Sequence, residues 1–305
     1  MYPYLNIGFM HLGTFGLLLW LSAVAATVAM HKNFSRNGVD ADALNIVATV
    51  VVAGVIGAKV WHELEDVREL EFALRMIGQP GWHHPGQVAL GFLGWFRAGF
   101  AWFGGMTASI VALMLQGHWA HFKGPQWKSI DDPGPVLGAR LGAMRMLDLA
   151  APATALGYGI GRIGCLLAGD GDYGVNTTLP WGVHMMHGAD EYNRALVLPT
   201  PATALVQPTP IYELIFSLVV FWLLWRLGKR AKPVGLLTGV YLALSGVGRF
   251  LVEFVRINPR LYFHNTMSNA QVAALTSVIV GLIVIAASIG AGVRWSPQTA
   301  AESKI

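Results

Sequence analysis

The chain has 305 residues, of which 54% are hydrophobic and only 12% are charged, and its mean hydropathy is +0.50. This composition is too apolar for an ordinary soluble domain of this length and predicts an integral membrane protein. The formal net charge of +4 is explained by basic residues beside anionic lipid, so we expect no nucleic-acid partner. A lone cysteine, Cys165, excludes an intrachain disulfide and a cysteine-rich metal motif.

Seven stretches are apolar enough and long enough for a helix to cross a hydrocarbon layer of about 30 Å. In chain order they are 10–30, 42–62, 98–117, 148–168, 211–228, 234–255 and 271–293. Lysine and arginine are concentrated near 31–41, 118–147 and 226–233 and in the C-terminal tail. By the positive-inside rule these parts are cytoplasmic, which places the N-terminus outside and the C-terminus inside. The predicted fold class is an all-α integral membrane bundle of about seven transmembrane helices.

Two long connections on the expected outer side interrupt this bundle, at about 63–97 and 169–210. The first begins as a charged helix, ELEDVRELEFALRMIG, that breaks at QPGWHHPG. The second is rich in Gly, Pro, Thr and Asp and predicts short strands or turns that form a small external cap. The N-terminal sequence MYPYLNIGFM has no basic region ahead of its apolar stretch, so we expect the first helix to be retained. The chain is interpreted as one membrane domain, 1–305.

The ionisable residues within the predicted spans include Lys59, Arg162, Arg249 and Glu253, which we single out. A charge inside a bilayer costs about 2.5 kcal/mol or more, so it normally faces the protein interior or a wet cavity. Arg249 and Glu253 are four residues apart on one helix face, where they can pair. Arg162 and Arg249 together form a candidate fork for a phosphate near the outer leaflet. A glycine stripe beside Arg162 lets another helix or a lipid headgroup approach the backbone.

The segment GRIGCLLAGDGDYG, residues 161–174, follows LDLAAPATALGYGI. Together they resemble the signature region of the bacterial prolipoprotein diacylglyceryl transferases. Six further segments are similar to family motifs and occur in the family's order: TFGLLLW, GAKVWHELE, FGGM, PTPIYE, GVGRFLVEFVR and MSNAQ. The resemblance therefore extends from about residue 10 to about residue 290.

The resemblance implies a lipid-dependent transferase of the bacterial cytoplasmic (inner) membrane. Such enzymes move a diacylglyceryl group from phosphatidylglycerol to the lipobox cysteine thiol of prolipoprotein signal peptides, and they require no metal or organic cofactor. Arg162 and Arg249 are then expected to be catalytic and to hold the phosphate, with Asp170 or Asp172 as the acidic partner of Arg162. The same motifs imply further substrate-binding residues: Gly104, Gly105, Gly161, Gly164, Gly174, Tyr212, Glu213 and Glu253.

The group that removes the thiol proton is left open by the sequence. Phe103 and Phe15 occupy positions where the family often has a histidine or a tyrosine, and Cys165 replaces an asparagine after Gly-Arg-x-Gly. Histidine titrates near neutral pH, which suits a general base. Three histidines on the expected outer side are candidates for this role: His62, His184 and His187.

Structural alternatives remain for several of these residues. Arg162 can tie helices together through backbone carbonyls, and Glu253 can neutralise Arg249. Glu213 can favour the N-terminal dipole of a helix, and Cys165 can be a small core residue. The alternative function is a non-catalytic relative that binds anionic phospholipid or a lipoprotein, which the two phenylalanine replacements motivate. A transporter is disfavoured, because the sequence shows no repeated pair of broken helices.

Overall fold

The structure is a computed structural model that describes residues 4–8, 10–39, 41–79, 83–97, 99, 101–119, 134–169, 174–184, 205–229, 232–292 and 294–295. The helices are α1 (Thr14–Arg36), α2 (Ala43–Glu65), α3 (Val67–Gly78), α4 (Pro85–Arg97), α5 (Trp102–Trp119), α6 (Gly134–Ala168), α8 (Thr209–Leu227), α9 (Leu236–Val252), the 3₁₀ helix η2 (Glu253–Val255) and α10 (Asn269–Ala291). Short strands pair antiparallel: β1 (Tyr4–Ile7) with β2 (Met10–Gly13), β3 (Val183–His184) with β4 (Leu205–Val206), β5 (Lys232–Pro233) with β8 (Arg294–Trp295), and β6 (Arg260–Tyr262) with β7 (Met267–Ser268).

The expected all-helical membrane bundle is confirmed as a mostly helical fold, and each of the seven predicted spans overlaps a helix. Within the described part of the chain, five helices are long and apolar enough to cross a membrane: α1, α2, α8, α9 continued through η2, and α10. Helices α5 and α6 do not meet this criterion of length and apolarity. Helix α5 contains Gln116 and His118, and helix α6 is rich in glycine and alanine and carries charged residues. The number of crossings therefore stays a prediction.

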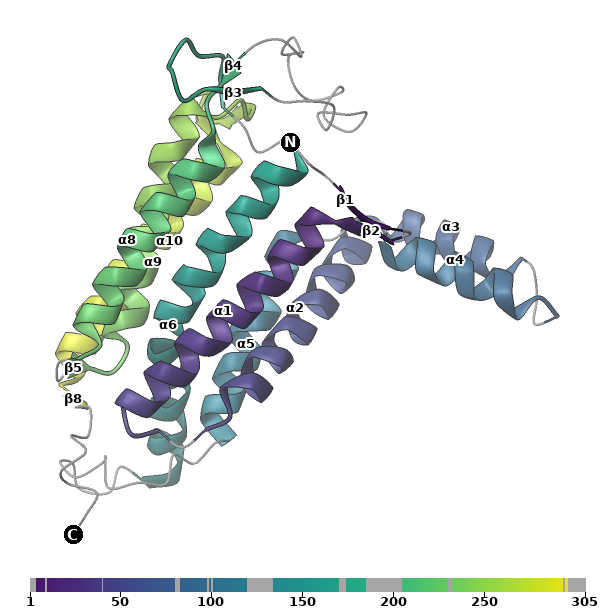
Figure 1. Ribbon diagram of the computed structural model, residues 1–305. Helices are drawn as coiled ribbons and strands as arrows, with labels where there is room; N and C mark the ends of the chain where they lie inside the picture. Colours follow the sequence, from purple (N-terminus) through teal and green to yellow (C-terminus); the bar gives the residue numbers. More distant parts are fainter. Residues whose placement is uncertain are drawn as a thin grey trace.

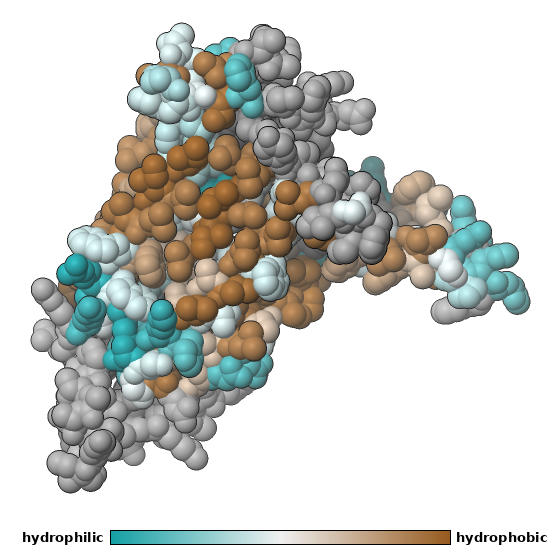
Figure 2. All heavy atoms as spheres, in the orientation of Figure 1, coloured by the Kyte–Doolittle hydropathy of each residue, from teal (hydrophilic) through white to brown (hydrophobic). Residues whose placement is uncertain are grey.

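The apolar side chains of these helices face outward over much of the bundle. Only 17% to 28% of the most apolar window of each of the five helices is buried within the protein. Large side chains such as Trp20, Leu64 and Ile283 are more than half exposed, and Figure 2 shows an apolar surface over the middle of the bundle with hydrophilic residues toward its ends. Such a surface is suited to lipid rather than to water.

Helix α6 is the centre of the bundle, packed against α1, α5, α8 and α9 (Figure 1). Three of its backbone carbonyls accept hydrogen bonds from side chains of neighbouring helices. Ser22 of α1 donates to Gly157 O at 2.6 Å, Asn33 of α1 donates to Leu149 O at 2.6 Å, and Ser217 of α8 donates to the carbonyl of Ala155. Because α6 contains Pro152, whose nitrogen cannot donate, these side-chain contacts help to hold the helix at the point where its own ladder is interrupted.

Glycines allow close contact between the helix pair α2 and α5. A Cβ atom on Gly104 would lie only 2.3 Å from the Gly57 carbonyl oxygen, and one on Gly105 would lie 3.2 Å from the carbonyl oxygen of Gly54. Gly104 and Gly105, expected at the substrate site, are thus placed in the α2–α5 contact. Their role in substrate binding stays a prediction.

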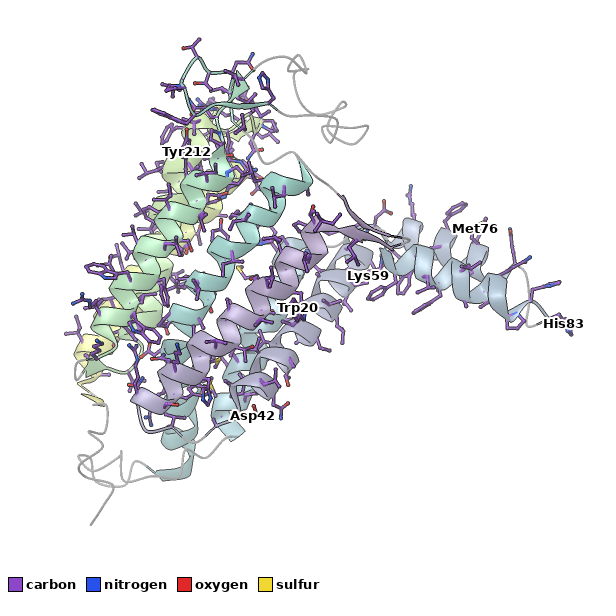
Figure 3. The ribbon with its side chains drawn as sticks, in the orientation of Figure 1. Trp20, Asp42, Lys59, Met76, His83 and Tyr212 are labelled. Carbon is purple, nitrogen blue, oxygen red and sulfur yellow. The ribbon has the colours of Figure 1, made fainter. Side chains whose placement is uncertain are left out.

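Helices α3 and α4 form a hairpin that projects from one end of α2 (Figure 1). The sequence predicted the first of these helices and the break after it, but not α4. Lys59, the buried cation of α2, explains how the hairpin is attached. Its Nζ lies 2.7 Å from Glu63 Oε1, donates to the Trp95 carbonyl at 2.8 Å and stands 4.6 Å from the Trp95 ring centroid. The intramembrane charge at Lys59 is therefore paired and fixes α4 at the end of α2 (Figure 3).

Two buried apolar clusters lie toward one end of the bundle. The larger joins the last turns of α1, the start of α2 and the first half of α6, and includes Phe34, Ile46 and Leu149. The smaller joins α6 to the second half of α8 and the start of α9, and includes Leu224 and Leu237. Arg145 and Asp148 of α6 are buried beside these clusters, and a second set of buried charged side chains lies at the opposite end of α6, α8 and α9.

Candidate active site

Four helical segments meet at one end of the bundle, beside β3 and β4 (Figure 1). They are the C-terminal part of α6, the start of α8, the end of α9 with η2, and the start of α10. Figure 3 places Tyr212 of α8 at this end and Asp42 at the opposite end. Arg162, Glu213, Arg249, Glu253 and Arg256 contact one another here. We refer to these five residues as the charged cluster.

Glu213 is the centre of the charged cluster, with a side chain only 3% exposed. Its Oε2 lies 3.4 Å from Arg162 Nε and 3.8 Å from Arg256 Nη1, and its Oε1 lies 3.6 Å from Arg249 Nη1. The sequence places this carboxylate five residues into α8, just after the prolines of the PTPIYE segment that begin the helix. Three guanidinium groups therefore surround one buried carboxylate.

Glu253 is held more tightly than Glu213. Its Oε1 accepts hydrogen bonds of 2.7 Å from both Asn258 and Ser268, and its Oε2 lies 3.0 Å from Arg249 Nη1. Ser268 also caps α10. Its hydroxyl oxygen accepts a hydrogen bond from the Gln271 backbone N–H, and the Ser268 backbone N–H donates to the side-chain oxygen of Gln271. The MSNAQ motif is thus a capping box that also fixes a carboxylate of the cluster.

Arg256 is a cluster residue that the sequence analysis missed. It follows η2, and its backbone bridges to Gly174, while its side chain is 6% exposed. Its Nε lies 3.7 Å from Glu253 Oε2. A Cβ on Gly174 would lie 2.4 Å from the Val255 carbonyl oxygen, so only glycine allows this approach. The signature segment and the GVGRFLVEFVR segment therefore meet through a backbone contact that requires glycine at position 174, and a role of Gly174 in substrate binding stays a prediction.

Tyr158 is a second residue that the sequence analysis missed. Its hydroxyl donates to Glu213 Oε1 at 2.8 Å, and its ring centroid lies 4.8 Å from the guanidinium carbon of Arg162. Arg162 Nη1 also donates to Cys165 Sγ at 3.8 Å. Tyr158, Arg162 and Cys165 are spaced at one helical turn on α6, and this spacing was the available signal. Tyr158 thus orients both the central carboxylate and one of the arginines.

The charge of the cluster decides what it can bind. Three guanidinium groups against two carboxylates leave one net positive charge, in a site whose carboxylates are 3% and 2% exposed. Guanidinium groups present parallel N–H donors that match the oxygens of a phosphate. The arrangement is therefore suited to a singly charged phosphodiester. Among the described residues there is no group of three or more His, Cys, Asp or Glu that could hold a metal ion.

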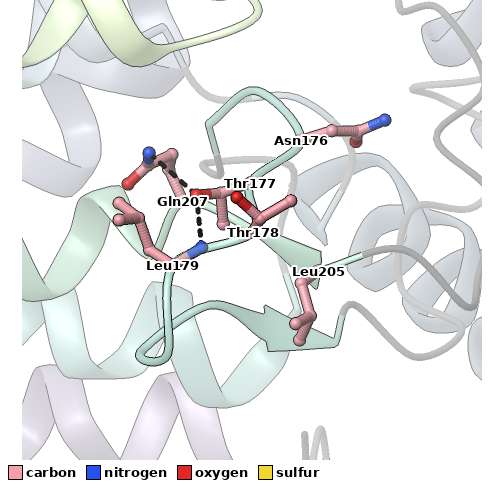
Figure 4. A pocket seen from close by; sticks show the side chains of 6 residues that line it. All are labelled: Asn176, Thr177, Thr178, Leu179, Leu205 and Gln207. Carbon is pink, nitrogen blue, oxygen red and sulfur yellow. Dashed lines mark hydrogen bonds between the residues drawn. The ribbon is translucent and has the colours of Figure 1, made fainter.

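A pocket with a mixed polar and apolar lining lies in the segment that contains β3 and β4 (Figure 4). It has a volume of about 580 Å³ and is lined by Asn176, Thr177, Thr178, Leu179, Leu205 and Gln207. Gln207 accepts from the Tyr212 hydroxyl at 2.5 Å, and Tyr212 in turn accepts from Trp181 Nε1 at 2.7 Å. Tyr212, expected to bind substrate, therefore connects this pocket to the start of α8, where Glu213 is the next residue.

The other predicted site residues lie in different places. Gly161 has open space around its Cα, whereas Gly164 packs against Leu18 and Phe15 of α1. His62 lies on α2 against Gly99, on the opposite side of α6 and α1 from α8 and α9 (Figure 1), so the structure does not bring it to the charged cluster. His184 is exposed in β3. Three predicted residues lie outside the described part of the chain: Asp170, Asp172 and His187.

The apolar bundle and the charged cluster define a multi-pass membrane protein with a set of arginines and carboxylates inside its helices. Comparison with known proteins then gives the family: the model for the prolipoprotein diacylglyceryl transferases matches residues 3–287, and the chain belongs to this family. It is accordingly a multi-pass protein of the bacterial cytoplasmic membrane.

Three curated relatives carry the name phosphatidylglycerol–prolipoprotein diacylglyceryl transferase. The protein from Clostridium tetani is 28% identical over 272 residues, covering 88% of this chain and 90% of the relative. That from Leifsonia xyli is 25% identical, covering 89% and 73%. A second copy from Clostridium perfringens is 26% identical, covering 89% of both chains. The similarity to each relative thus extends over most of both sequences.

Proposed function

We propose that the chain transfers the diacylglyceryl group of phosphatidylglycerol to the lipobox cysteine of prolipoproteins, and that the charged cluster holds the lipid phosphate. The observation that carries this assignment is the placement of Arg162, Arg249 and Arg256 around the buried Glu213. The transfer displaces a phosphate ester from a primary carbon, and negative charge develops on the departing phosphate. Donors already in place at that phosphate stabilise the transition state without reorganisation.

The orientation of the chain supports access from the outer leaflet. Basic residues predict a cytoplasmic location for the ends of α1 and α8 that lie opposite the cluster, so the cluster lies toward the outer face. We propose seven crossings, with α5 and α6 as the two that apolarity alone does not identify. The segment containing β3 and β4 then forms the external cap. Its pocket beside Tyr212 is positioned to receive part of the signal peptide.

The first test is transfer to a synthetic lipobox peptide by the purified protein with phosphatidylglycerol, followed by mass spectrometry. Arg162→Ala should reduce product at least about 10²-fold, because one group that stabilises the leaving phosphate is lost. Arg162→Lys should recover little of this loss, since an ammonium cannot make the paired contacts of a guanidinium.

Arg226→Ala is the matched control, since Arg226 lies in the last turn of α8 and stacks on Trp222, away from the cluster. It should leave transfer unchanged. Full activity of Arg162→Ala would exclude the proposed role of the cluster. A folded protein that retains phosphatidylglycerol but forms no product would instead favour the non-catalytic alternative. Phe103 motivates that alternative, because its side chain is 41% exposed at the start of α5 and has no titratable group.

A further inference from the structure

The proposed reaction releases a proton, and its acceptor is the open question at this site. The S–H bond of the lipobox cysteine breaks, its sulfur forms a bond to the primary carbon of the diacylglyceryl group, and the C–O bond to phosphate breaks with its electron pair on oxygen. The phosphodiester carries one negative charge and the released glycerol phosphate carries two. The thiol proton must therefore go to a base near the cluster.

The two carboxylates of the cluster differ in their capacity to accept that proton. Glu253 already accepts hydrogen bonds from Asn258 and Ser268 on Oε1 and pairs with Arg249 at 3.0 Å on Oε2. Among the described residues, Glu213 accepts one hydrogen bond, from Tyr158 on Oε1. Oε2 of each carboxylate has no hydrogen-bond donor there, but the ion pairs of Glu213 Oε2 are 3.4 and 3.8 Å long, against 3.0 and 3.7 Å for those of Glu253 Oε2. Glu213 is therefore the less tightly held of the two carboxylates.

Phosphate binding would change the surroundings of Glu213 more than those of Glu253. Arg162 and Arg256 contact Glu213 at long distances, and turning either side chain toward a phosphate would weaken its ion pair with Glu213. A buried carboxylate that loses its countercharges favours the neutral, protonated form. Within the described part of the chain, the charged groups around it are Arg162 from α6, Arg249 and Glu253 from α9 and η2, and Arg256 after η2.

We propose that Glu213 is the catalytic residue that accepts the thiol proton, an inference that rests on the proposed function of the cluster. The charges then balance within one step. Protonation of Glu213 raises the net charge of the cluster from one to two positive charges while the phosphate passes from one to two negative charges. Tyr158 keeps Glu213 oriented by donating to Oε1, which leaves Oε2 to face the thiol. The proton leaves Glu213 with the released glycerol phosphate.

The experiment compares two peptides that differ in one atom. One carries the lipobox cysteine, whose thiol ionises near pH 8.5 in an ordinary peptide, and the other carries selenocysteine, whose selenol is already ionised at neutral pH. Glu213→Gln keeps the side-chain shape and an oxygen for the Tyr158 hydroxyl but cannot accept a proton. We expect Glu213→Gln to slow transfer to the cysteine peptide about 10²-fold or more, and to come within about 10-fold of wild type on the selenocysteine peptide.

Glu253→Gln is the matched control, because it removes the same charge from the same cluster. Its loss of activity should be the same with both peptides. Phosphatidylglycerol binding, measured in detergent for each variant, should not be weakened by Glu213→Gln. Circular dichroism and gel filtration verify that each variant is folded. If Glu213→Gln does not fold, Glu213→Asp takes its place, and its slower transfer to cysteine should likewise be recovered with selenocysteine.

The outcomes separate this inference from the proposed function. An equal loss with both peptides in Glu213→Gln, or no loss with the cysteine peptide, would overturn Glu213 as the proton acceptor while leaving the transferase assignment intact. Failure of the wild-type protein to modify either peptide would overturn the proposed function itself.

Discussion

Arg162 contacts groups of three different chemical kinds, two of them one turn away on α6 and the third on α8. Its Nε faces Glu213, the Tyr158 ring lies beside its guanidinium group, and its Nη1 donates to Cys165 Sγ at 3.8 Å. The sulfur contact is the weakest of these, because a thiol sulfur is a poor hydrogen-bond acceptor. Cys165 is thus expected to position Arg162 rather than to react.

The replacement Cys165→Asn should therefore retain transfer activity, because the amide oxygen is a stronger acceptor for Arg162 Nη1 than the thiol. Cys165→Val, of similar size but without an acceptor, should lower the rate about 3-fold to 10-fold, an effect of roughly 1 kcal/mol for one hydrogen bond. Initial rates at saturating peptide measure both variants. An inactive Cys165→Asn protein would assign a specific chemical role to the thiol.

The site residues divide into those that the sequence could predict and those that it could not. Arg162, Arg249 and Glu253 were predicted because a charge inside an apolar span requires a partner. Arg256 follows the predicted sixth span and reads as a loop residue; only the turn made by η2 and the bridge to Gly174 bury it. Tyr158 has no charge, so its spacing of one helical turn from Arg162 was the signal that an apolar glycine-rich helix offered.

At the scale of elements, the glycines have two distinct uses. Gly104 allows α2 and α5 to approach until their backbones touch, whereas Gly161 has no atom within 4 Å of the place where a Cβ would be. The first glycine is required by packing. The second faces open space on the turn that carries Arg162, where a lipid can approach the backbone.

Three alanine substitutions separate these uses. Gly104→Ala should lower the free energy of unfolding by about 1–3 kcal/mol, since the new methyl group clashes with Gly57. Gly161→Ala should not lower stability, because alanine favours a helix by about 0.5–1 kcal/mol over glycine, but it should reduce transfer if substrate approaches there. Gly94→Ala in α4, which also has open space, is the control and should keep full activity. Thermal unfolding in detergent and peptide transfer are the two measurements.

Prediction at this scale succeeded for the long helices and failed for the hairpin. The apolar stretches indicated the bundle helices because about 18 consecutive apolar residues admit few other structures. Helix α4 was missed because its sequence, PGQVALGFLGWFR, adjoins the third predicted span and reads as the approach to it. The contact between Lys59 and the Trp95 carbonyl, which turns α4 back to α2, joins residues 36 positions apart and has no local signal.

For the whole molecule, the proposed orientation places the α3–α4 hairpin outside and the end of α8 inside. The chain has a single cysteine, so a Cys165→Asn background allows one new thiol at a time. His83→Cys at the tip of the hairpin should react with a membrane-impermeant maleimide in intact cells, and Lys229→Cys after α8 should react only after permeabilisation. Labelling of Lys229→Cys in intact cells would reverse the proposed orientation.

The apolar clusters also bear on how the enzyme fails when it is heated. The smaller cluster lies at the end of α8 and the start of α9, and the larger at the end of α1, the start of α2 and the first half of α6, both far along the bundle from Glu213 and Glu253. The end with the charged cluster is held instead by ion pairs and a few hydrogen bonds, and regions of this kind open locally at a lower free energy than a packed core. Inactivation should therefore begin at temperatures where the bundle is still folded, and cooling should restore the enzyme. Selection for heat tolerance would then change the contacts around the charged cluster and leave the two apolar clusters unchanged.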